Sequence, residues 1–133
     1  MKKILIINAN YYKDISLGLL RSAKNLLPKK IKIITINVPG VFEIPVTISK
    51  NLNKFDAFIA LGCVIKGQTP HFDFISRSIS DALINLSFKY NLPVSNGILN
   101  CLTKKQAMIR SSSIKNKGIE SAKALVSVLN YSK

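Results

Sequence analysis

Short apolar runs alternate with segments of helical periodicity along the whole chain. Residues 3–8 are apolar enough for a buried strand, and apolar residues then recur at helical spacing from Ile15 until Pro28. Three more strands are expected, at 31–38, 57–61 and 93–99. Four more helices are expected, at 44–52, from Pro70 onward, after Thr103 and from about Asn116.

This order of elements predicts the fold class. Four strands that alternate with helices favour a central four-stranded parallel sheet covered on both faces, a three-layer α/β/α sandwich of the flavodoxin-like type. The sequence shows no linker or internal repeat, so we expect a single domain over residues 1–133. In such sheets ligands bind at the carboxyl ends of the strands, where residues 8–12, 39–45, 62–71 and those after Gly97 fall.

The apolar runs, the first residues and the cysteines of the sequence indicate in which compartment the protein works. No apolar run approaches the roughly 20 residues that a membrane span requires. The start, Met1 to Lys3 followed by four apolar residues, is too short for a signal peptide, so a cytoplasmic location is expected. Cys63 and Cys101 lack the spacing of a metal site and are expected to be reduced, partly buried thiols.

The net charge of +14 raises the question of a nucleic-acid partner. The 17 lysines and 3 arginines are scattered, however, with no run longer than two and no interleaved aromatic residues. We therefore expect neither a nucleic-acid nor a membrane partner. A basic nucleic-acid-binding module remains the alternative, and its affinity would fall steeply as salt rises.

Residues 62–73 are the most informative stretch of the sequence. They follow an apolar run, and Gly62 and Gly67 suggest a loop between that strand and a helix. Thr69 and Pro70 have the residue types of a helix N-cap and first helical position. A strand, loop and helix start in this order is typical of an anion-binding turn.

The same stretch carries a candidate proton carrier. Backbone N–H groups of Gly67, Gln68 and Thr69 are placed to converge on a phosphate at the positive end of the helix. His71, the only histidine of the chain, follows Pro70, and histidine is the residue type most suited to carry protons near neutral pH. A histidine packed at a helix start is the alternative. The adjacent phosphate cradle favours an enzyme that acts on a phosphorylated small molecule.

Four other residues have both a functional and a structural interpretation. Tyr11 follows the first strand and either stacks on a flat ring or covers the sheet edge. Glu43 lies among apolar residues, but a helix N-terminus also favours a carboxylate there. Arg110 offers a planar fork to phosphate and Lys117 precedes a helix; both are equally compatible with solvated surface positions.

Four segments in this order resemble the lumazine synthase family. They are Val38-Pro39-Gly40-Val41-Phe42-Glu43-Ile44-Pro45, the stretch from Leu61 to Asp73, Gln106-Ala107 with Arg110, and Asn116-Lys117-Gly118 with Glu120. The resemblance covers about residues 4–129. It implies a transferase that condenses 5-amino-6-(D-ribitylamino)uracil with 3,4-dihydroxy-2-butanone 4-phosphate to 6,7-dimethyl-8-ribityllumazine, phosphate and water, in riboflavin biosynthesis. No metal and no organic cofactor are implied.

The resemblance also assigns roles to residues. It implies contacts with the pyrimidine and its ribityl arm for Tyr11, Val41, Phe42, Glu43, Cys63, Val64, Ile65, Asn96 and Lys117. It implies contacts with the phosphate for Gln68, Thr69 and Arg110. His71 matches the position of the family's proton carrier. Because the attacking amine belongs to the substrate, no activated serine or cysteine is required.

The chain departs from the family pattern at a few positions. Asn96 stands where many members carry a phenylalanine facing the pyrimidine. Residues 100–102 replace two common threonines, and Lys66 replaces a common arginine. These departures leave a catalytically impaired relative, or a protein that only binds flavin or lumazine, as a second interpretation.

The resemblance implies active sites between neighbouring subunits of a pentamer. We therefore expect a homo-oligomer. Some relatives assemble pentamers into a shell with the help of an N-terminal extension, whereas this chain starts at its first strand. A free pentamer is the expectation.

Overall fold

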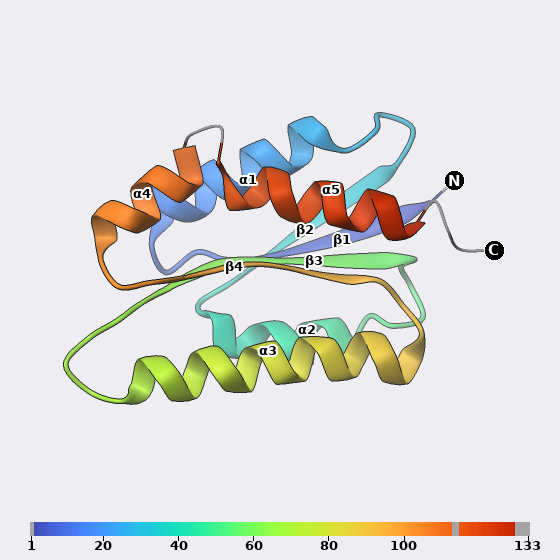
Figure 1. The fold of residues 1–133 in the computed structure, drawn as a ribbon. Helices are drawn as coiled ribbons and strands as arrows, with labels where there is room; N and C mark the ends of the chain where they lie inside the picture. The colour runs from blue at the N-terminus through green and yellow to red at the C-terminus, as the bar shows by residue number, and fades with distance from the viewer. Residues whose placement is uncertain (1, 113–114, 130–133) are drawn as a thin grey trace.

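Four parallel strands form the centre of the molecule. In the computed structural model, which describes residues 2–112 and 115–129, their order is β2-β1-β3-β4 and each neighbouring pair is parallel (Figure 1). The strands are β1 (Lys3–Ala9), β2 (Lys32–Val38), β3 (Ala57–Ile65) and β4 (Val94–Cys101). All four carboxyl ends therefore lie at one edge of the sheet, as the sequence predicts.

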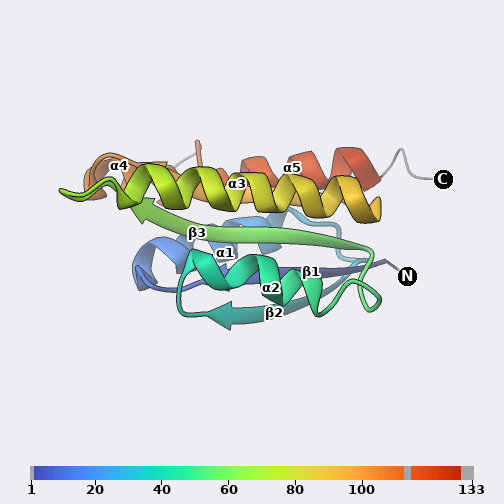
Figure 2. The same ribbon diagram turned by 90° about the horizontal axis from the view of Figure 1, so that it is seen from below.

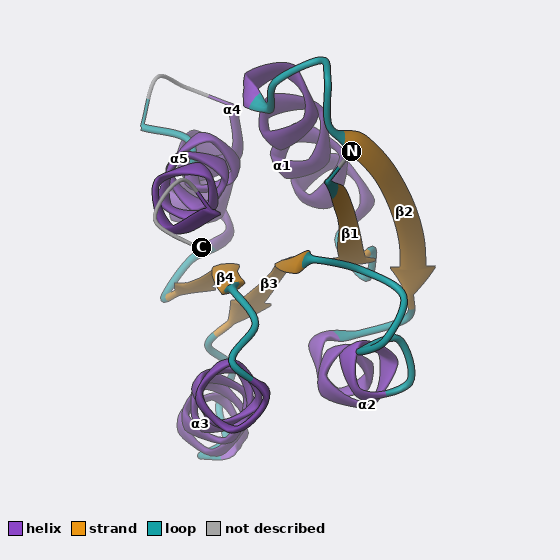
Figure 3. Ribbon diagram, turned by 90° about the vertical axis from the view of Figure 1, so that its right-hand side faces the viewer, coloured by secondary structure: helices purple, strands orange, loops and turns teal. Residues whose placement is uncertain are grey.

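Helices cover both faces of this sheet. They are α1 (Lys13–Leu26), the 3-10 helix η1 (Val41–Glu43), α2 (Ile44–Ser49), α3 (His71–Tyr90), α4 (Lys104–Ser112) and α5 (Lys117–Leu129). Helices α1, α4 and α5 lie on one face and α2 and α3 on the other (Figures 2 and 3). The three-layer sandwich is confirmed. Among these described helices, none has the length and hydropathy needed to cross a membrane.

The core consists of two apolar layers, one on each face of the sheet. In β1, Ile4 and Ile6 belong to the layer under α1 and α5, while Leu5 and Ile7 belong to the layer over α2 and α3. All four side chains are fully buried. A strand buried on both faces must be apolar at every position, which explains the continuous apolar runs that mark β1 and β3 in the sequence.

The structure corrects the predicted end of β3. The strand continues four residues beyond Leu61, so Gly62 lies in the sheet rather than in a loop. A Cβ atom on Gly62 would lie 2.9 Å from Cγ1 of Val41 and 3.0 Å from Cβ of Ala9, closer than side chains tolerate. This glycine is required by close packing between β3, η1 and β1, and does not mark a strand end.

Other boundaries differ by one to three residues. Helix α3 begins at His71, one residue later than predicted, with Pro70 as the N-cap. Helix α2 ends at Ser49 rather than at Leu52, and β4 extends to Cys101 rather than to Leu99. The helix expected after Thr103 is capped by that residue, as its residue type suggests, because its Oγ1 accepts the N–H of Gln106 at 3.2 Å. Ser113, which the sequence groups with the polar residues after Arg110, lies outside the described residues.

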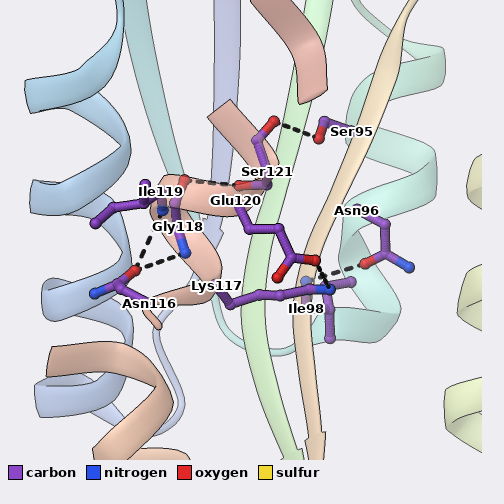
Figure 4. A network of polar contacts seen from close by, with 9 residues as sticks. All are labelled: Ser95, Asn96, Ile98, Asn116, Lys117, Gly118, Ile119, Glu120 and Ser121. Carbon is purple, nitrogen blue, oxygen red and sulfur yellow. Dashed lines mark hydrogen bonds and ion pairs between the residues drawn. The ribbon is translucent and has the colours of Figure 1, made fainter. Parts of the chain in front are cut away.

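Asn116 connects three parts of the helical layer, and Figure 4 shows its capping bonds to the start of α5. Its Oδ1 accepts the N–H groups of Gly118 at 2.6 Å and Ile119 at 3.4 Å, which caps α5. Its Nδ2 donates to Ser22 Oγ at 2.9 Å in α1 and to the Ser111 carbonyl at 2.7 Å in α4. The side chain is buried, so losing it would leave several polar groups without partners.

The substitution Asn116→Ala should lower the free energy of unfolding by about 2 kcal/mol or more, because it removes a cap and two buried hydrogen bonds. Asn116→Asp should lose at least as much although a carboxylate still caps α5, because a buried carboxylate oxygen would replace the donor 2.7 Å from the Ser111 carbonyl oxygen and repel it. Urea unfolding followed by circular dichroism measures both. Equal stability of the alanine variant and the unsubstituted protein would contradict this role of Asn116.

Candidate active site

The carboxyl ends of β1, β2 and β3 carry most of the residues selected from the sequence. Tyr11 lies two residues after β1, η1 lies three residues after β2, and residues 66–70 connect β3 to α3. Because the three strands are parallel neighbours, these connections share one edge of the sheet. The structure thus brings these predicted site residues to the edge of the sheet where α/β proteins bind ligands.

Two exposed aromatic rings stand at this edge. Tyr11 is 74% exposed and Phe42 is 70% exposed. Tyr12, by contrast, is half-buried against the core, and burial raises the pKa of its hydroxyl, with smaller contributions from Cys63 and Tyr11. The two tyrosine rings meet edge to face with centroids 4.9 Å apart. Tyr12 therefore covers the sheet edge, which leaves Tyr11 as the ring available for stacking.

Glu43 has a defined structural partner. Its Oε1 accepts the N–H of Gly40 at 3.0 Å, and its own N–H donates to the Gly40 carbonyl at 3.2 Å. This pair of bonds closes the turn that forms η1 and holds buried Val41 below exposed Phe42. The structural interpretation of Glu43 is supported, and its second carboxylate oxygen accepts no hydrogen bond from the described residues.

The thiol of Cys63 is buried and is not suited to react with a substrate. Its side chain is buried in the layer under α1, and burial, together with nearby Cys101, raises the pKa of its thiol to about 12. A thiol with that pKa is almost entirely protonated at neutral pH and is a poor nucleophile. Val64 and Ile65, which complete β3, are half-buried.

The loop after β3 has unpaired backbone donors. The N–H groups of Gly67, Gln68 and Thr69 form no hydrogen bond with the described part of the chain. All three residues are exposed, and they lead directly into the N-terminus of α3. Free N–H groups at the positive end of a helix of 20 residues suit a phosphate.

His71 is the first residue of α3 and lies exposed beside this loop. Its backbone N–H donates to Thr69 Oγ1 at 3.4 Å, and its ring has no hydrogen-bond partner within residues 2–112 and 115–129. The alternative of a histidine packed at the helix start is therefore wrong. The imidazole is accessible to a substrate bound at the loop.

Arg110 and Lys117 belong to a second region, on the α4 and α5 side of β4. Both line one cavity, whose other polar residues include Gln106 and Glu120. Arg110 donates from its guanidinium to the Gln106 carbonyl at 3.5 Å, the outer limit of a hydrogen bond. Lys117 Nζ lies 3.0 Å from Glu120 Oε1. Arg110 is exposed, so most of its fork remains available to an anion.

Asn96 lies in β4, the outermost strand of the sheet, which pairs only with β3. It lines a neighbouring groove between α3 and α5, and Glu120 borders both this groove and the cavity of Arg110. The side chain is exposed, with Oδ1 accepting the N–H of Ile98 at 3.0 Å. Figure 4 shows the Lys117–Glu120 pair and the Asn96 side chain near β4, with Asn96 bonded to Ile98 and its amide nitrogen turned away from the pair.

The predicted site residues therefore fall into two sets. Tyr11, Phe42 and His71 belong to the first and line neither the cavity nor the groove beside β4. Arg110 and Lys117 belong to the second. A single chain does not gather the two sets in one cavity.

The sequence analysis assigned no role to Gln106 and Glu120, which line the same cavity as Arg110 and Lys117. Gln106 accepts the Leu102 N–H through its side chain and the Arg110 guanidinium through its carbonyl, so it links the end of β4 to α4. The spacing of Gln106 three residues after Thr103 is the signature of a helix start and could have revealed it. Glu120, three residues after Lys117, has the spacing of an ion pair on a helix.

The described residues contain no cluster of three or more histidine, cysteine, aspartate or glutamate side chains suited to a metal ion.

Known proteins resemble the chain over its whole length. A family model described as 6,7-dimethyl-8-ribityllumazine synthase matches residues 1–133. A protein of that name from Campylobacter jejuni subsp. doylei is 39% identical over 138 residues, which cover 98% of this chain and 90% of that protein. The protein of the same name from Buchnera aphidicola subsp. Schizaphis graminum is 40% identical, with 98% and 87% covered.

A third relative, from Campylobacter curvus, carries the same name and is 37% identical over 139 residues, covering 99% of this chain and 89% of its own. The family match spans both the strand ends with their exposed rings and the region of Arg110 and Lys117. The chain belongs to the 6,7-dimethyl-8-ribityllumazine synthase family.

Proposed function

We propose that the protein condenses 5-amino-6-(D-ribitylamino)uracil with 3,4-dihydroxy-2-butanone 4-phosphate, releasing 6,7-dimethyl-8-ribityllumazine, phosphate and water. Family membership supports a transferase of riboflavin biosynthesis. The observation that carries the assignment of substrates is the carboxyl edge of the sheet. There, exposed aromatic rings stand at the same edge as a loop with free N–H groups and an accessible histidine.

Each part of this edge suits one part of a substrate. The faces of Tyr11 and Phe42 suit a flat pyrimidine ring. The N–H groups of Gln68 and Thr69, at the positive end of α3, suit the phosphate of the second substrate. Cys63, Val64 and Ile65 offer backbone groups between these two positions.

The proposed chemistry requires proton transfer and positioning more than covalent catalysis. The amine of the pyrimidine attacks the ketone, and loss of water gives an imine. Removal of a proton from the carbon next to the imine then expels phosphate, and ring closure expels a second water. Every step moves a proton to or from nitrogen, oxygen or carbon, which is a task for a general acid and base. His71, exposed beside the phosphate loop, is proposed to be that group.

Arg110 and Lys117 are proposed to complete the site of a neighbouring copy. This explains why a single chain separates them from Tyr11 and His71, although the family resemblance implies one site. The arginine would add a bidentate contact to the phosphate, and the lysine would contact the pyrimidine. The protein is accordingly proposed to be a homo-oligomer, a pentamer by the family resemblance, working in the cytoplasm without a nucleic-acid partner.

Exposed apolar residues on α3 support self-association. Phe74, Ile84 and Phe88 are 71%, 66% and 89% exposed. Their spacing of ten and four residues places them within about 80° of the helix circumference. Arg77 and Asp81, also exposed, lie between them on the helix. Apolar side chains aligned on one exposed helix face are typical of a surface that another protein chain covers.

The direct test is to mix the purified protein with both substrates and follow lumazine formation by absorbance against the uncatalysed background. Saturable formation that depends on protein concentration would support the proposal. A folded oligomer that binds lumazine without accelerating the reaction would instead make the protein a flavin- or lumazine-binding relative.

His71→Ala should lower kcat by about 100-fold, because the variant lacks the proposed general acid and base. Its thermal unfolding midpoint should stay unchanged, since the imidazole is exposed and makes no contact that stabilises the fold. Steady-state kinetics and calorimetry measure the two quantities. An unchanged kcat would remove His71 from the mechanism.

Arg110→Ala should raise the KM for the butanone phosphate by about tenfold or more, with a smaller change in the KM for the pyrimidine, because a charged hydrogen-bond donor is lost. Arg21→Ala, which removes an exposed arginine from α1, is the matched control and should leave both values unchanged. An effect confined to the pyrimidine would contradict the phosphate assignment.

Phe88→Glu should dissociate the oligomer, because it places a charge in the proposed apolar contact on α3. Leu17→Glu, at an exposed leucine on α1, is the matched control. Analytical ultracentrifugation reports the mass of each variant. Loss of activity in the Phe88 variant should accompany dissociation, since each site needs two copies, and an active monomer would contradict the shared site.

A further inference from the structure

Lysine side chains collect at the edge of the sheet opposite the candidate active site. Each connection in a parallel sheet returns the chain to the amino end of the next strand, so the strand starts and the helix C-termini share one edge (Figure 2). Nine of the 17 lysines lie at this amino edge. Six of them surround the starts of β1 and β2, namely Lys2, Lys3, Lys24, Lys29, Lys30 and Lys32. The other three, Lys50, Lys54 and Lys89, follow α2 or lie in the last turn of α3.

The fold brings these lysines together from separate parts of the chain. The N–H of Lys32 donates to the Lys2 carbonyl at 2.9 Å, and the N–H of Asp56 donates to the Lys3 carbonyl at 2.8 Å. Figure 3 views the molecule from this edge. In the sequence the same lysines are scattered in runs of one or two, and the expectation of no membrane partner rested on that scatter. The folded chain removes this reason, because it concentrates the charge on one face.

Acidic residues are nearly absent from the amino edge. Within residues 2–112 and 115–129, Asp56 is the only acid there, and its Oδ2 is engaged by the N–H of Lys3 at 2.8 Å. The acids at the opposite, carboxyl edge lie in η1 or in the first turn of a helix, and they are Asp14, Glu43, Asp73 and Glu120. The net charge of +14 is therefore concentrated at the amino edge.

The ammonium groups of this edge have few partners within the chain. None of the nine lysines forms an ion pair with a carboxylate in the part of the chain that the structure describes. Two of them contact aromatic rings: Lys3 Nζ lies 5.5 Å from the ring centroid of Phe55, and Lys89 Nζ lies 5.4 Å from that of Tyr90. All except Lys3 are exposed. Most of this positive charge is therefore available to an external anion.

The residue types favour a broad anionic surface as the partner. The three arginines lie within α1, α3 and α4, so every cation at the amino edge is a lysine. Specific contacts with proteins and bases favour the planar fork of arginine, and protein interfaces are depleted in lysine. Flexible ammonium groups suit attraction to many phosphate groups at once. Tyr90, which is 42% exposed beside Lys89, adds a side chain favoured at the level of lipid headgroups.

We propose that the amino edge is a docking surface for an anionic phospholipid bilayer. The ammonium groups attract the headgroups, and no helix enters the hydrocarbon layer. The attachment is reversible, because salt screens it. The candidate active site lies at the opposite edge of the sheet, so docking leaves Tyr11 and His71 accessible to substrates. The inference uses no residue of that site and is therefore independent of the proposed function.

Vesicle sedimentation tests this surface directly. The purified full chain is mixed with vesicles of phosphatidylcholine alone or with about 30% phosphatidylserine, at about 50 mM and at about 300 mM salt. We expect binding only to the vesicles with phosphatidylserine, with a Kd at least about tenfold higher at the higher salt. Failure to bind these vesicles at the lower salt, or equal binding to both kinds of vesicle, would overturn the proposal.

Neutralising part of the amino edge locates the binding surface. A variant that combines Lys29→Gln, Lys30→Gln and Lys54→Gln should have a Kd for the anionic vesicles about tenfold higher or more, because three exposed charges are lost. These side chains form no ion pair with the described residues, so the thermal unfolding midpoint should stay unchanged.

The matched control removes the same charge from the carboxyl edge. It combines Lys13→Gln, Lys104→Gln and Lys105→Gln, which are exposed positions in the first turns of α1 and α4. Its Kd should rise by less than about threefold. Equal weakening in the two variants would mean that net charge alone drives binding, and the amino edge would then have no special role.

Nucleic acid is the other polyanion that such a face attracts. Duplex DNA and single-stranded RNA are therefore added to the bound vesicles at an equal concentration of negative charge. We expect the protein to remain mostly on the vesicles, because the amino edge lacks arginines for base contacts. Nucleic acid that displaces the protein from the vesicles would overturn the lipid assignment and identify the edge as a nucleic-acid surface.

Discussion

Because β1 pairs in parallel with β2 on one side and β3 on the other, the first three strands end at one edge and their connections meet there. This pairing requires strands that are apolar on both faces, and it requires the small residue Gly62 where β3 passes Val41 and Ala9. This pairing places Tyr11, η1 and the loop of residues 66–70 at that edge. The position of the candidate active site is therefore a consequence of sheet topology.

The position of Lys117 depends on a different feature, the hydrogen bonds of the buried Asn116 side chain. By binding Ser22 in α1, Ser111 in α4 and the first N–H groups of α5, it fixes where Lys117 begins the last helix. Gly118 allows this arrangement, because a Cβ there would collide with the Leu19 carbonyl oxygen. A network of buried hydrogen bonds is more rigid than a single surface contact, so it fixes the position of Lys117 at the start of α5 firmly.

Much of the fold and part of the site followed from the sequence. Alternating apolar runs and helical segments gave the parallel sheet, and local sequence signals located the cap at Thr103 and the start of the last helix near Asn116, but not the capping role of Asn116 itself. The end of β3 was missed because Gly62 has the composition of a turn and only tertiary packing explains it. The exposure of His71 and the orientation of Asn96 depend on neighbours distant in space or on a backbone direction, which residue spacing does not encode.

The open edge of β4 shows how one side chain can satisfy a backbone group of an edge strand. An edge strand presents unpaired N–H and C=O groups that attract other strands. Asn96 satisfies the N–H of Ile98 with its oxygen, which removes one of those groups from the edge. The same bond turns the amide nitrogen to the side away from Ile98 (Figure 4). An apolar ring at this position could not accept the N–H of Ile98, so the asparagine satisfies a backbone donor that such a ring would leave to solvent or to another chain.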